Sequence, residues 1–222
     1  MAFHPLDEKT WERAEHFRYY TETVRTRYNL NYDIDVTDLV RLVKEKQLKF
    51  YPTVLWMVMR VVNDTKELRM ATDAEGNPGY WDFCVPSYTI FHKDDHTFSD
   101  IWTEWSDDFA VFHANAVHDM QTYADVKGVK AKDGKPDNFT ALSMEPWLSF
   151  TGHGCDTYTA PQMLFPIFVM GKWYERDGRK YLPLSLSVNH AAADGWHSAQ
   201  AILAIERLAA HPESWIGPHH AK

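Results

Sequence analysis

The sequence predicts an α+β sandwich in which helices cover one β-sheet. Helical periods dominate the first third of the chain, and strand-like alternation is most common between about residue 80 and residue 190. One further helical pattern closes the chain after Ser198. Helices and strands grouped in this way favour a layered arrangement over a repeated series of parallel βαβ units.

One domain is expected to cover residues 1–222. The length suffices for one sizeable core or for two small ones. The 9 Trp, 11 Tyr and 12 Phe residues are spread along the whole chain, which fits a single core. The polar stretch at 127–138 carries Gly and Pro but is too short to link two domains.

Each expected helix has its own signals. Asp7 or Thr10 can cap the first, and Asp35 can cap the second. Pro52 suits the first turn of the third, which is apolar on nearly all sides and should therefore be buried. Ser106 and the two aspartates after it open the fourth. The expected helices are residues 10–28, a segment after Asp35, 52–64, 106–124 and a closing segment from Ser198.

The expected strands are rich in aromatic and β-branched residues and are bounded by turn residues. A turn at 76–80 precedes the first of them, and residues 175–179 form a hairpin turn before the last. The expected strands are residues 80–92, 96–105, 139–150, 161–174 and 182–189.

The stretch 182–197, LPLSLSVNHAAADGWH, combines a strand end with polar chemistry. Leucine and valine alternate with smaller or polar residues, so His190 continues the apolar face where the strand ends. Asp194 follows four residues later, beside Gly195, which permits a sharp turn. A histidine with a carboxylate behind it is a plausible general base. A satisfied polar residue at a strand end is an equally open interpretation.

A metal site is a further interpretation of the same stretch. His190, Asp194 and His197 would share one face if the stretch were helical. The preceding strand pattern and Gly195 argue against such a helix, so no metal is expected.

Composition excludes several classes of protein. A net charge of −8, without a run of Lys or Arg, disfavours nucleic-acid binding. The longest apolar run, residues 54–62, is interrupted by Arg60 and is too short to span a membrane. A signal peptide would show a basic segment followed by an apolar one, and the sequence shows no such pattern. A cytoplasmic location is therefore expected. Cys84 and Cys155 form no disulfide framework.

Nine segments in one order carry a resemblance that covers essentially the whole chain: WERAEHF, KFYP, ELRMA, YWD, YTIFH, TFS, SMEPW, PIFVMGKW and LPLSLSVNHAAADGWH. Together they resemble the chloramphenicol acetyltransferase family. The resemblance implies a two-layer α/β sandwich of the coenzyme A-dependent acyltransferase type, usually a homotrimer with each active site between subunits. The chain is also similar to the acyltransferase domain of dihydrolipoamide acyltransferases, which share a His-x-x-x-Asp-Gly core.

The resemblance implies a role for four catalytic residues. His190 matches the general base, and Asp194 matches the structural aspartate that pairs with Arg13. Ser143 matches the serine whose hydroxyl donates to the oxyanion. A neutral His190 would remove the proton of an acceptor hydroxyl, which attacks the thioester of acetyl-CoA directly.

The resemblance also implies two sets of binding residues. Coenzyme A would lie against Lys49, Trp147, Lys172 and Trp173. The acceptor would lie against Tyr19, Tyr20, His153, Cys155 and Met163.

The sequence departs from the family's pattern at several of these positions. Asn189 replaces the first of two adjacent histidines, and Val169 replaces a threonine that holds a water near the oxyanion. His153 and Cys155 replace phenylalanine and leucine, while Met163 replaces an aromatic residue. Trp173 stands where a tyrosine is common. The catalytic residues are retained, whereas the acceptor pocket has changed.

Three functions are therefore compatible with the sequence. The first is inactivation of the antibiotic chloramphenicol by O-acetylation. The second is acetylation of another small hydroxyl or amine compound. The third is a noncatalytic relative that binds a hydrophobic ligand, which the presence of all four catalytic residues argues against.

Overall fold

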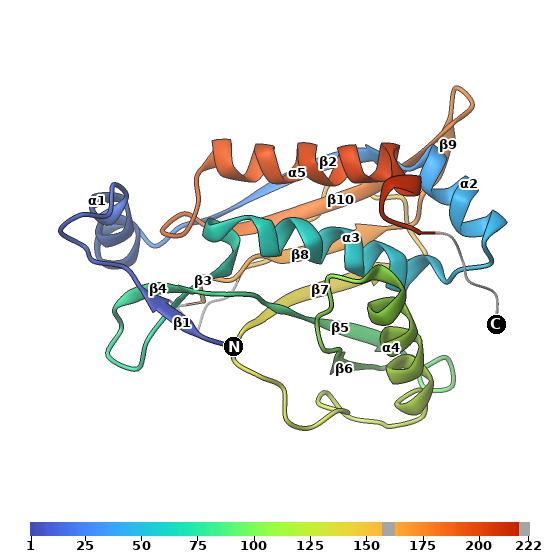
Figure 1. Cartoon of the computed structure of the whole chain (residues 1–222), viewed down its shortest axis with the longest axis horizontal. Helices are drawn as coiled ribbons and strands as arrows, with labels where there is room; N and C mark the ends of the chain where they lie inside the picture. Colours follow the sequence, from blue (N-terminus) through green and yellow to red (C-terminus); the bar gives the residue numbers. More distant parts are fainter. Residues whose placement is uncertain (157–162, 218–222) are drawn as a thin grey trace.

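A mixed β-sheet forms one layer of the fold, and helices form the other (Figure 1). The computed structural model describes residues 1–156 and 163–217. The main sheet has the strand order β2-β10-β8-β7-β5-β6, with β9 paired to β10, and a second sheet has the order β1-β4-β3. The strands are β1 Phe3–Pro5, β2 Arg27–Asp35, β3 Met70–Thr72, β4 Pro78–Trp81, β5 Val85–Phe91, β6 Phe98–Trp102, β7 Phe139–Glu145, β8 Ile167–Gly171, β9 Tyr174–Arg176 and β10 Arg179–Asn189.

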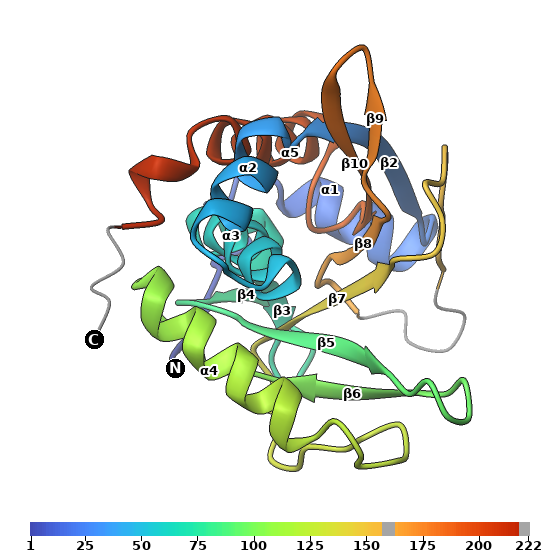
Figure 2. The same cartoon turned by 90° about the vertical axis from the view of Figure 1, so that its right-hand side faces the viewer.

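Helices α2 to α5 gather on one face of the main sheet, as Figure 2 shows, and α1 lies at the end of the sheet (Figure 1). The helices are α1 Ala14–Arg18, α2 Thr37–Glu45, α3 Phe50–Asp64, α4 Phe109–Thr122 and α5 Gly195–Ala210, with shorter helical turns at Tyr19–Thr23, Lys66–Arg69 and Pro212–Ser214. Most side chains of α3 are buried, as its all-round apolar pattern predicts. Asp108 caps α4 by accepting hydrogen bonds from the backbone N–H groups of Ala110 and Val111. No helix in the described part of the chain has the length and apolar character needed to cross a membrane.

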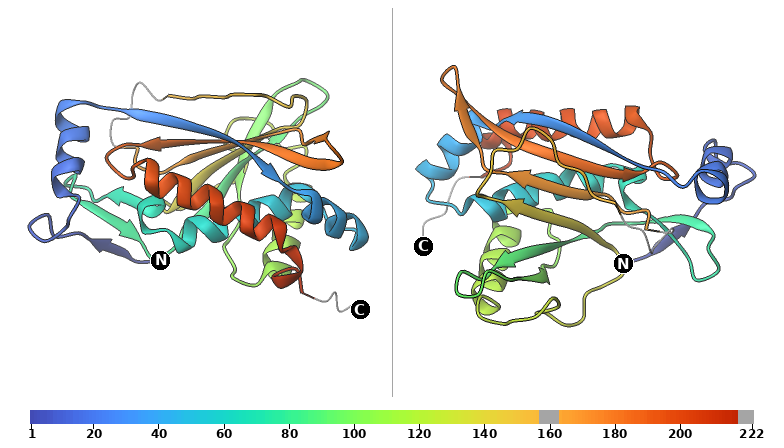
Figure 3. Two further views of the ribbon diagram at one scale, coloured as in Figure 1. Left: turned by 90° about the horizontal axis from the view of Figure 1, so that it is seen from above. Right: turned by 180° about the vertical axis from the view of Figure 1, so that it is seen from behind.

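Alternate side chains of strand β10 point to the two faces of the sheet. Leu182, Leu184 and Leu186 are buried in the main core, on the helix side. The alternating Ser185 and Ser187 are also buried, although they point to the other face. That face is covered by the segment 146–156, which follows β7 (Figure 3). The buried serine hydroxyls are therefore satisfied by this segment instead of by a helix.

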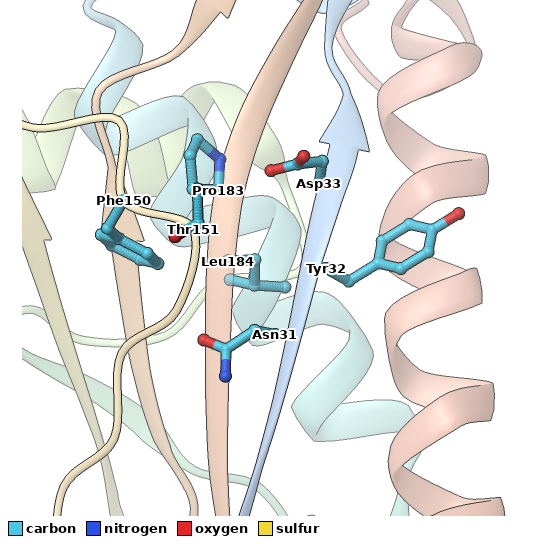
Figure 4. Close-up of a pocket in the computed structure, with 7 residues that line it drawn as sticks. All are labelled: Asn31, Tyr32, Asp33, Phe150, Thr151, Pro183 and Leu184. Carbon is cyan, nitrogen blue, oxygen red and sulfur yellow. The ribbon is translucent and has the colours of Figure 1, made fainter.

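Backbone groups hold this segment in place. Ser185 Oγ donates to the carbonyl of His153 (2.9 Å), and the N–H of His153 donates to Asn31 Oδ1 (2.9 Å). Ser187 Oγ donates to the carbonyl of Cys155 (3.3 Å). A cavity of about 70 Å³ remains under the segment, beside Thr151 (Figure 4). It has room for about two water molecules and is too small for a substrate.

The first helix is much shorter than expected. It ends at Arg18, continues as one π-helical turn to Thr23, and gives way to β2, so the prediction of one helix over 10–28 was wrong. Strand β2 pairs antiparallel with β10 along its whole length. Its residues alternate between an inner and an outer face, and pairing with β10 satisfies their backbone groups. The expected strand over 139–150 is also shorter, because Pro146 lacks the N–H group that would continue the ladder.

The hairpin before β10 is confirmed. Asp177 and Gly178 both have positive φ angles (52° and 74°). Two consecutive residues of this kind are typical of the tight turn that joins antiparallel strands. The turn starts β10 in the register that buries its leucines.

Candidate active site

His190 lies immediately after β10, in a turn that is almost completely buried. Its N–H donates to the carbonyl of Thr26 (2.9 Å). Asn189 Oδ1 accepts from the N–H of Ala191 (2.9 Å), and the three alanines after His190 have no exposed surface. Only small residues allow the turn to pack this closely against the rest of the chain. The position of the His190 backbone is therefore fixed by its neighbours.

Arg13 and Asp194 form an ion pair behind this turn. Nη1 of Arg13 binds Oδ2 of Asp194, and Nη2 donates to the carbonyl of His190 (3.3 Å). Oδ1 of Asp194 lies 3.2 Å from Nδ1 of His190, although the two atoms are not aligned for a hydrogen bond. Partial burial works to raise the pKa of Asp194, but the hydrogen bond and charge of Arg13, with the nearby histidines, lower it below its ordinary value. The carboxylate thus stays charged beside the imidazole.

Two tyrosines hold the ring of His190. Tyr20 stacks parallel to it, with ring centroids 4.0 Å apart and planes 6° apart. Tyr28 meets it edge-on at 5.1 Å. The hydroxyl of Tyr28 hydrogen-bonds Ser198 Oγ (2.7 Å) and donates to the carbonyl of Ala193 (3.2 Å). The two rings confine the imidazole, and its Nδ1 is buried next to Asp194, which leaves Nε2 as the nitrogen able to meet a substrate.

Ser143 lies in a different place, on the wall of a cavity of about 640 Å³. Its Oγ is 3.0 Å from the hydroxyl of Thr89 on the neighbouring strand β5. Most of the cavity wall is apolar or aromatic, and its size suits a small organic ligand. The lining residues are Tyr51, Thr89, Ile90, Phe91, His96, Phe98, Met120, Ser143, Met144, Glu145, Pro146 and Trp147.

The strand register separates Ser143 from His190 within one chain. Ser143 pairs with Val169, and Val169 pairs with Ser185, so two strand spacings, about 10 Å, divide Ser143 from β10. His190 follows Ser185 by five residues, which adds about 17 Å along the strand. The two Cα atoms are thus about 19 Å apart. In Figure 1 the turn after β10 lies beside α1 on the left, whereas β7 points to the right.

Of the residues expected to bind coenzyme A, Trp147 is the one among the described lining residues of the Ser143 cavity. The N–H of Lys172 donates to the carbonyl of Leu148 (2.7 Å), the residue after Trp147. Lys49 precedes α3 by one residue, and its N–H donates to Nε2 of His113 (3.2 Å). Trp173 packs against the main core.

The residues expected to bind the acceptor divide between the two places. Tyr19 meets Tyr20 edge-on beside His190, and the carbonyl of Met163 accepts from Asn189 Nδ2 (3.2 Å). The carbonyl of Cys155 lies at Ser187, three residues before His190. His153 instead lies on the Ser143 side.

The imidazole of His153 faces a carboxylate on that side. Its Nε2 is 3.7 Å from Oε1 of Glu145. Sequence reasoning missed Glu145, Tyr28 and Thr89, because their partners are brought to them only by strand pairing and loop packing. Glu145 had one usable signal, its position two residues after Ser143 on a strand.

A metal site is not formed at His190. His197 Nδ1 accepts from the N–H of Asp194 (3.2 Å), so it caps α5 instead of joining His190 and Asp194 on one face. Among residues 1–156 and 163–217, no three His, Cys, Asp or Glu side chains are grouped to hold a metal ion.

The sequence is similar to that of known proteins along nearly its whole length. The sequence profile of the family described as chloramphenicol acetyltransferase matches residues 1–206. A chloramphenicol acetyltransferase from Clostridium perfringens is 40% identical over 217 residues, 98% of this chain and 99% of that protein. One from Vibrio anguillarum is 40% identical over 202 residues, 91% of this chain and 92% of that protein.

Solved structures confirm the expected fold. A chloramphenicol acetyltransferase aligns with a TM-score of 0.80 at 21% identity, over 93% of this chain and 99% of that one. The dihydrolipoamide acetyltransferase of Azotobacter vinelandii aligns with a TM-score of 0.68 at 18% identity, over 92% of this chain and 89% of that one. Both similarities extend over more than nine-tenths of this chain.

Proposed function

The chain belongs to the chloramphenicol acetyltransferase family and is an acyltransferase, and we propose that it transfers the acetyl group of acetyl-CoA to a hydroxyl of chloramphenicol. The observation that carries the proposal is the confined imidazole of His190 with the Arg13–Asp194 pair behind it. Acetylation of the hydroxyl would inactivate the antibiotic. The reaction is assigned to the cytoplasm.

His190 is the general base of the proposed reaction. Its Nε2 takes the proton of the acceptor hydroxyl as that oxygen attacks the thioester carbon. The carbonyl oxygen becomes negative in the tetrahedral intermediate, and Ser143 Oγ donates a hydrogen bond to it. Collapse of the intermediate breaks the carbon–sulfur bond, and His190 returns its proton to the sulfur of coenzyme A. Arg13 and Asp194 position the imidazole without touching the substrate.

Two chains are needed to assemble this site. A base and an oxyanion donor that act on one carbonyl must lie within about 8 Å of each other. Within one chain the strand register sets His190 and Ser143 about 19 Å apart. His190 of one subunit therefore acts with Ser143 of its neighbour. A homotrimer satisfies this requirement three times with one repeated interface.

Exposed apolar side chains support an interface at the Ser143 cavity. Phe98, Trp147 and Leu148 are 53%, 58% and 63% exposed in the single chain. Aromatic side chains of this kind are enriched at the buried centre of protein interfaces. A neighbouring subunit would cover them and close the open side of the cavity.

Acetyl-CoA is the proposed acetyl donor. Coenzyme A is strongly anionic, whereas the chain carries a net charge of −8, so its phosphates need local positive charge. Lys49 and Lys172 are assigned to the phosphates. Trp147, which is exposed beside the cavity, and Trp173 are assigned to the apolar parts of the cofactor.

A second candidate acceptor is another small hydroxyl compound with more polar character. The observation that favours it is the Glu145–His153 pair beside the Ser143 cavity. A charged group there suits a polar acceptor better than a wholly apolar one.

Release of free thiol from acetyl-CoA tests the proposal. We expect release that depends on chloramphenicol, and a monoacetylated product in the mass spectrum. Thiol release with another alcohol but not with chloramphenicol would favour the second candidate. No release with any hydroxyl acceptor would overturn the assignment.

A further inference from the structure

Glu145 brings a negative charge close to the oxyanion donor. It follows Ser143 by two residues on β7, so both side chains point to the same face of the sheet, with Cα atoms about 7 Å apart. Both residues line the same cavity, and Glu145 is the one carboxylate among its described lining residues. A single small molecule can therefore touch both side chains.

His153 lies close to the carboxylate of Glu145. Its Nε2 is 3.7 Å from Oε1 of Glu145. The backbone of His153 is fixed on both sides, by Asn31 and by Ser185, so the ring cannot follow a ligand far into the cavity. Its Nδ1 is buried without a hydrogen-bond partner.

The surroundings of Glu145 indicate which of the two substrates its charge would meet. The Glu145 side chain is 39% exposed in the single chain, so its carboxylate is accessible from the open side of the cavity. The imidazole of His153 lies 3.7 Å from Oε1, beyond hydrogen-bond distance, so the carboxylate keeps the capacity to accept a hydrogen bond from a ligand. A negative charge also cannot form an ion pair with the anionic phosphates of coenzyme A. Both points place the function of Glu145 with the acceptor and not with the acetyl donor.

We infer that Glu145, backed by His153, is a specificity-determining residue that selects hydroxyl acceptors carrying a cationic amino group near the acetylated hydroxyl. The inference rests on the proposed function, because it uses Ser143 as the oxyanion donor. The spacing of Ser143 and Glu145 fits a 1,2- or 1,3-amino alcohol. Its ammonium group donates a charge-assisted hydrogen bond to the carboxylate while its hydroxyl attacks the thioester.

Chloramphenicol and its free amine make a matched pair of probes. The amine lacks the dichloroacetyl group, so it presents an ammonium where chloramphenicol has a neutral amide, and the aromatic diol is otherwise the same. Thiol release gives kcat/KM for each acceptor, and mass spectrometry confirms the acetylated product. The variants are Glu145→Gln, which removes the charge at nearly constant shape, and Glu145→Met, which makes the wall apolar. Glu75→Gln removes an exposed charge in the β3–β4 turn and is the control.

We expect the ratio of kcat/KM for the amine to that for chloramphenicol to fall about ten- to hundredfold in Glu145→Gln. In Glu145→Met the ratio should fall further, with a lower KM for chloramphenicol. The Glu75→Gln control should keep the parent ratio. An unchanged ratio in both Glu145 variants, with chloramphenicol still turned over, would overturn the inference and leave the proposed function intact.

A binding measurement distinguishes failure of the inference from failure of the proposed function. If the parent acetylated neither probe, the proposed function would be wrong. Calorimetric titration with the amine would then decide the inference alone. Weaker binding by Glu145→Gln than by Glu75→Gln supports it, whereas equal binding or no binding overturns it.

Discussion

Arg13 binds the carboxylate of Asp194 across 181 positions of the sequence, and the same guanidinium donates to the carbonyl of His190. One side chain thus holds both ends of the turn that presents the imidazole. The side chain of Arg13 is only 7% exposed, so its charge depends on Asp194 for compensation. The short helix α1 serves to deliver this arginine to the end of β10.

Replacement of His190 by alanine should abolish acetyl transfer and leave the fold intact. The side chain is partly exposed and is confined mainly by ring contacts with Tyr20 and Tyr28. Loss of a general base lowers turnover by about 10²–10⁴. His211→Ala, at an exposed position after α5, is the matched control. Turnover of His190→Ala within tenfold of the parent would rule out the assignment of the base.

Replacement of Asp194 by alanine should lower both stability and activity. It would leave Arg13 buried without its counter-charge, which typically costs about 3–5 kcal/mol in a fully buried pair. Because the Asp194 side chain is 32% exposed, we expect about 1–3 kcal/mol. Denaturant unfolding measures the loss, with Asp125→Ala at an exposed position as the control. Superimposable unfolding curves with full activity would show that the pair has no structural role.

The contribution of Asp194 to stability should disappear in acid. The pKa of its carboxyl is lowered from the ordinary 3.8 in the folded state. A lowered pKa stabilises the fold above about pH 4, and the stabilisation is lost as pH falls through the folded-state value. The difference in unfolding free energy between the parent and Asp194→Asn should therefore shrink below pH 4. A difference that stays constant from pH 7 to pH 3 would contradict the shift.

Replacement of Ser143 by alanine should lower kcat about 10²–10³-fold, because one oxyanion donor is lost. The KM for either substrate should change little, since the hydrogen bond strengthens only as the charge develops. Ser214→Ala, in the helical turn after α5, is the control. A large rise in KM at constant kcat would show that Ser143 binds substrate in the ground state instead.

Sequence patterns predicted the elements whose structure depends mainly on residues that are close together in the sequence. The apolar helix α3, the cap at Asp108 and the hairpin at Asp177 all follow from neighbouring residues. Strand β2 was missed because the sequence up to Tyr28 continues a helical pattern, and only pairing with β10 makes it extended. Spacing also could not join Tyr28 to Ser198, which is 170 residues away.

The catalytic assignments drew on family resemblance, since spacing alone left His190 open. The structure adds the contacts of Arg13 and Tyr20 with His190, which local sequence cannot encode. It also adds the distance between His190 and Ser143, which follows from the pairing of β10, β8 and β7. That distance is a property of the sheet and not of any motif.

Mixing two inactive variants tests most directly whether one active site uses two chains. His190→Ala and Ser143→Ala should each be nearly inactive alone. Refolding them together in equal amounts should give mixed trimers in about three cases out of four, and each mixed trimer has one interface of its three that combines an intact histidine with an intact serine. About one interface in four is then intact over all trimers. We expect activity to recover to about a quarter of the parent value. Mixed trimers seen by native mass spectrometry without any recovered activity would contradict a site shared between subunits.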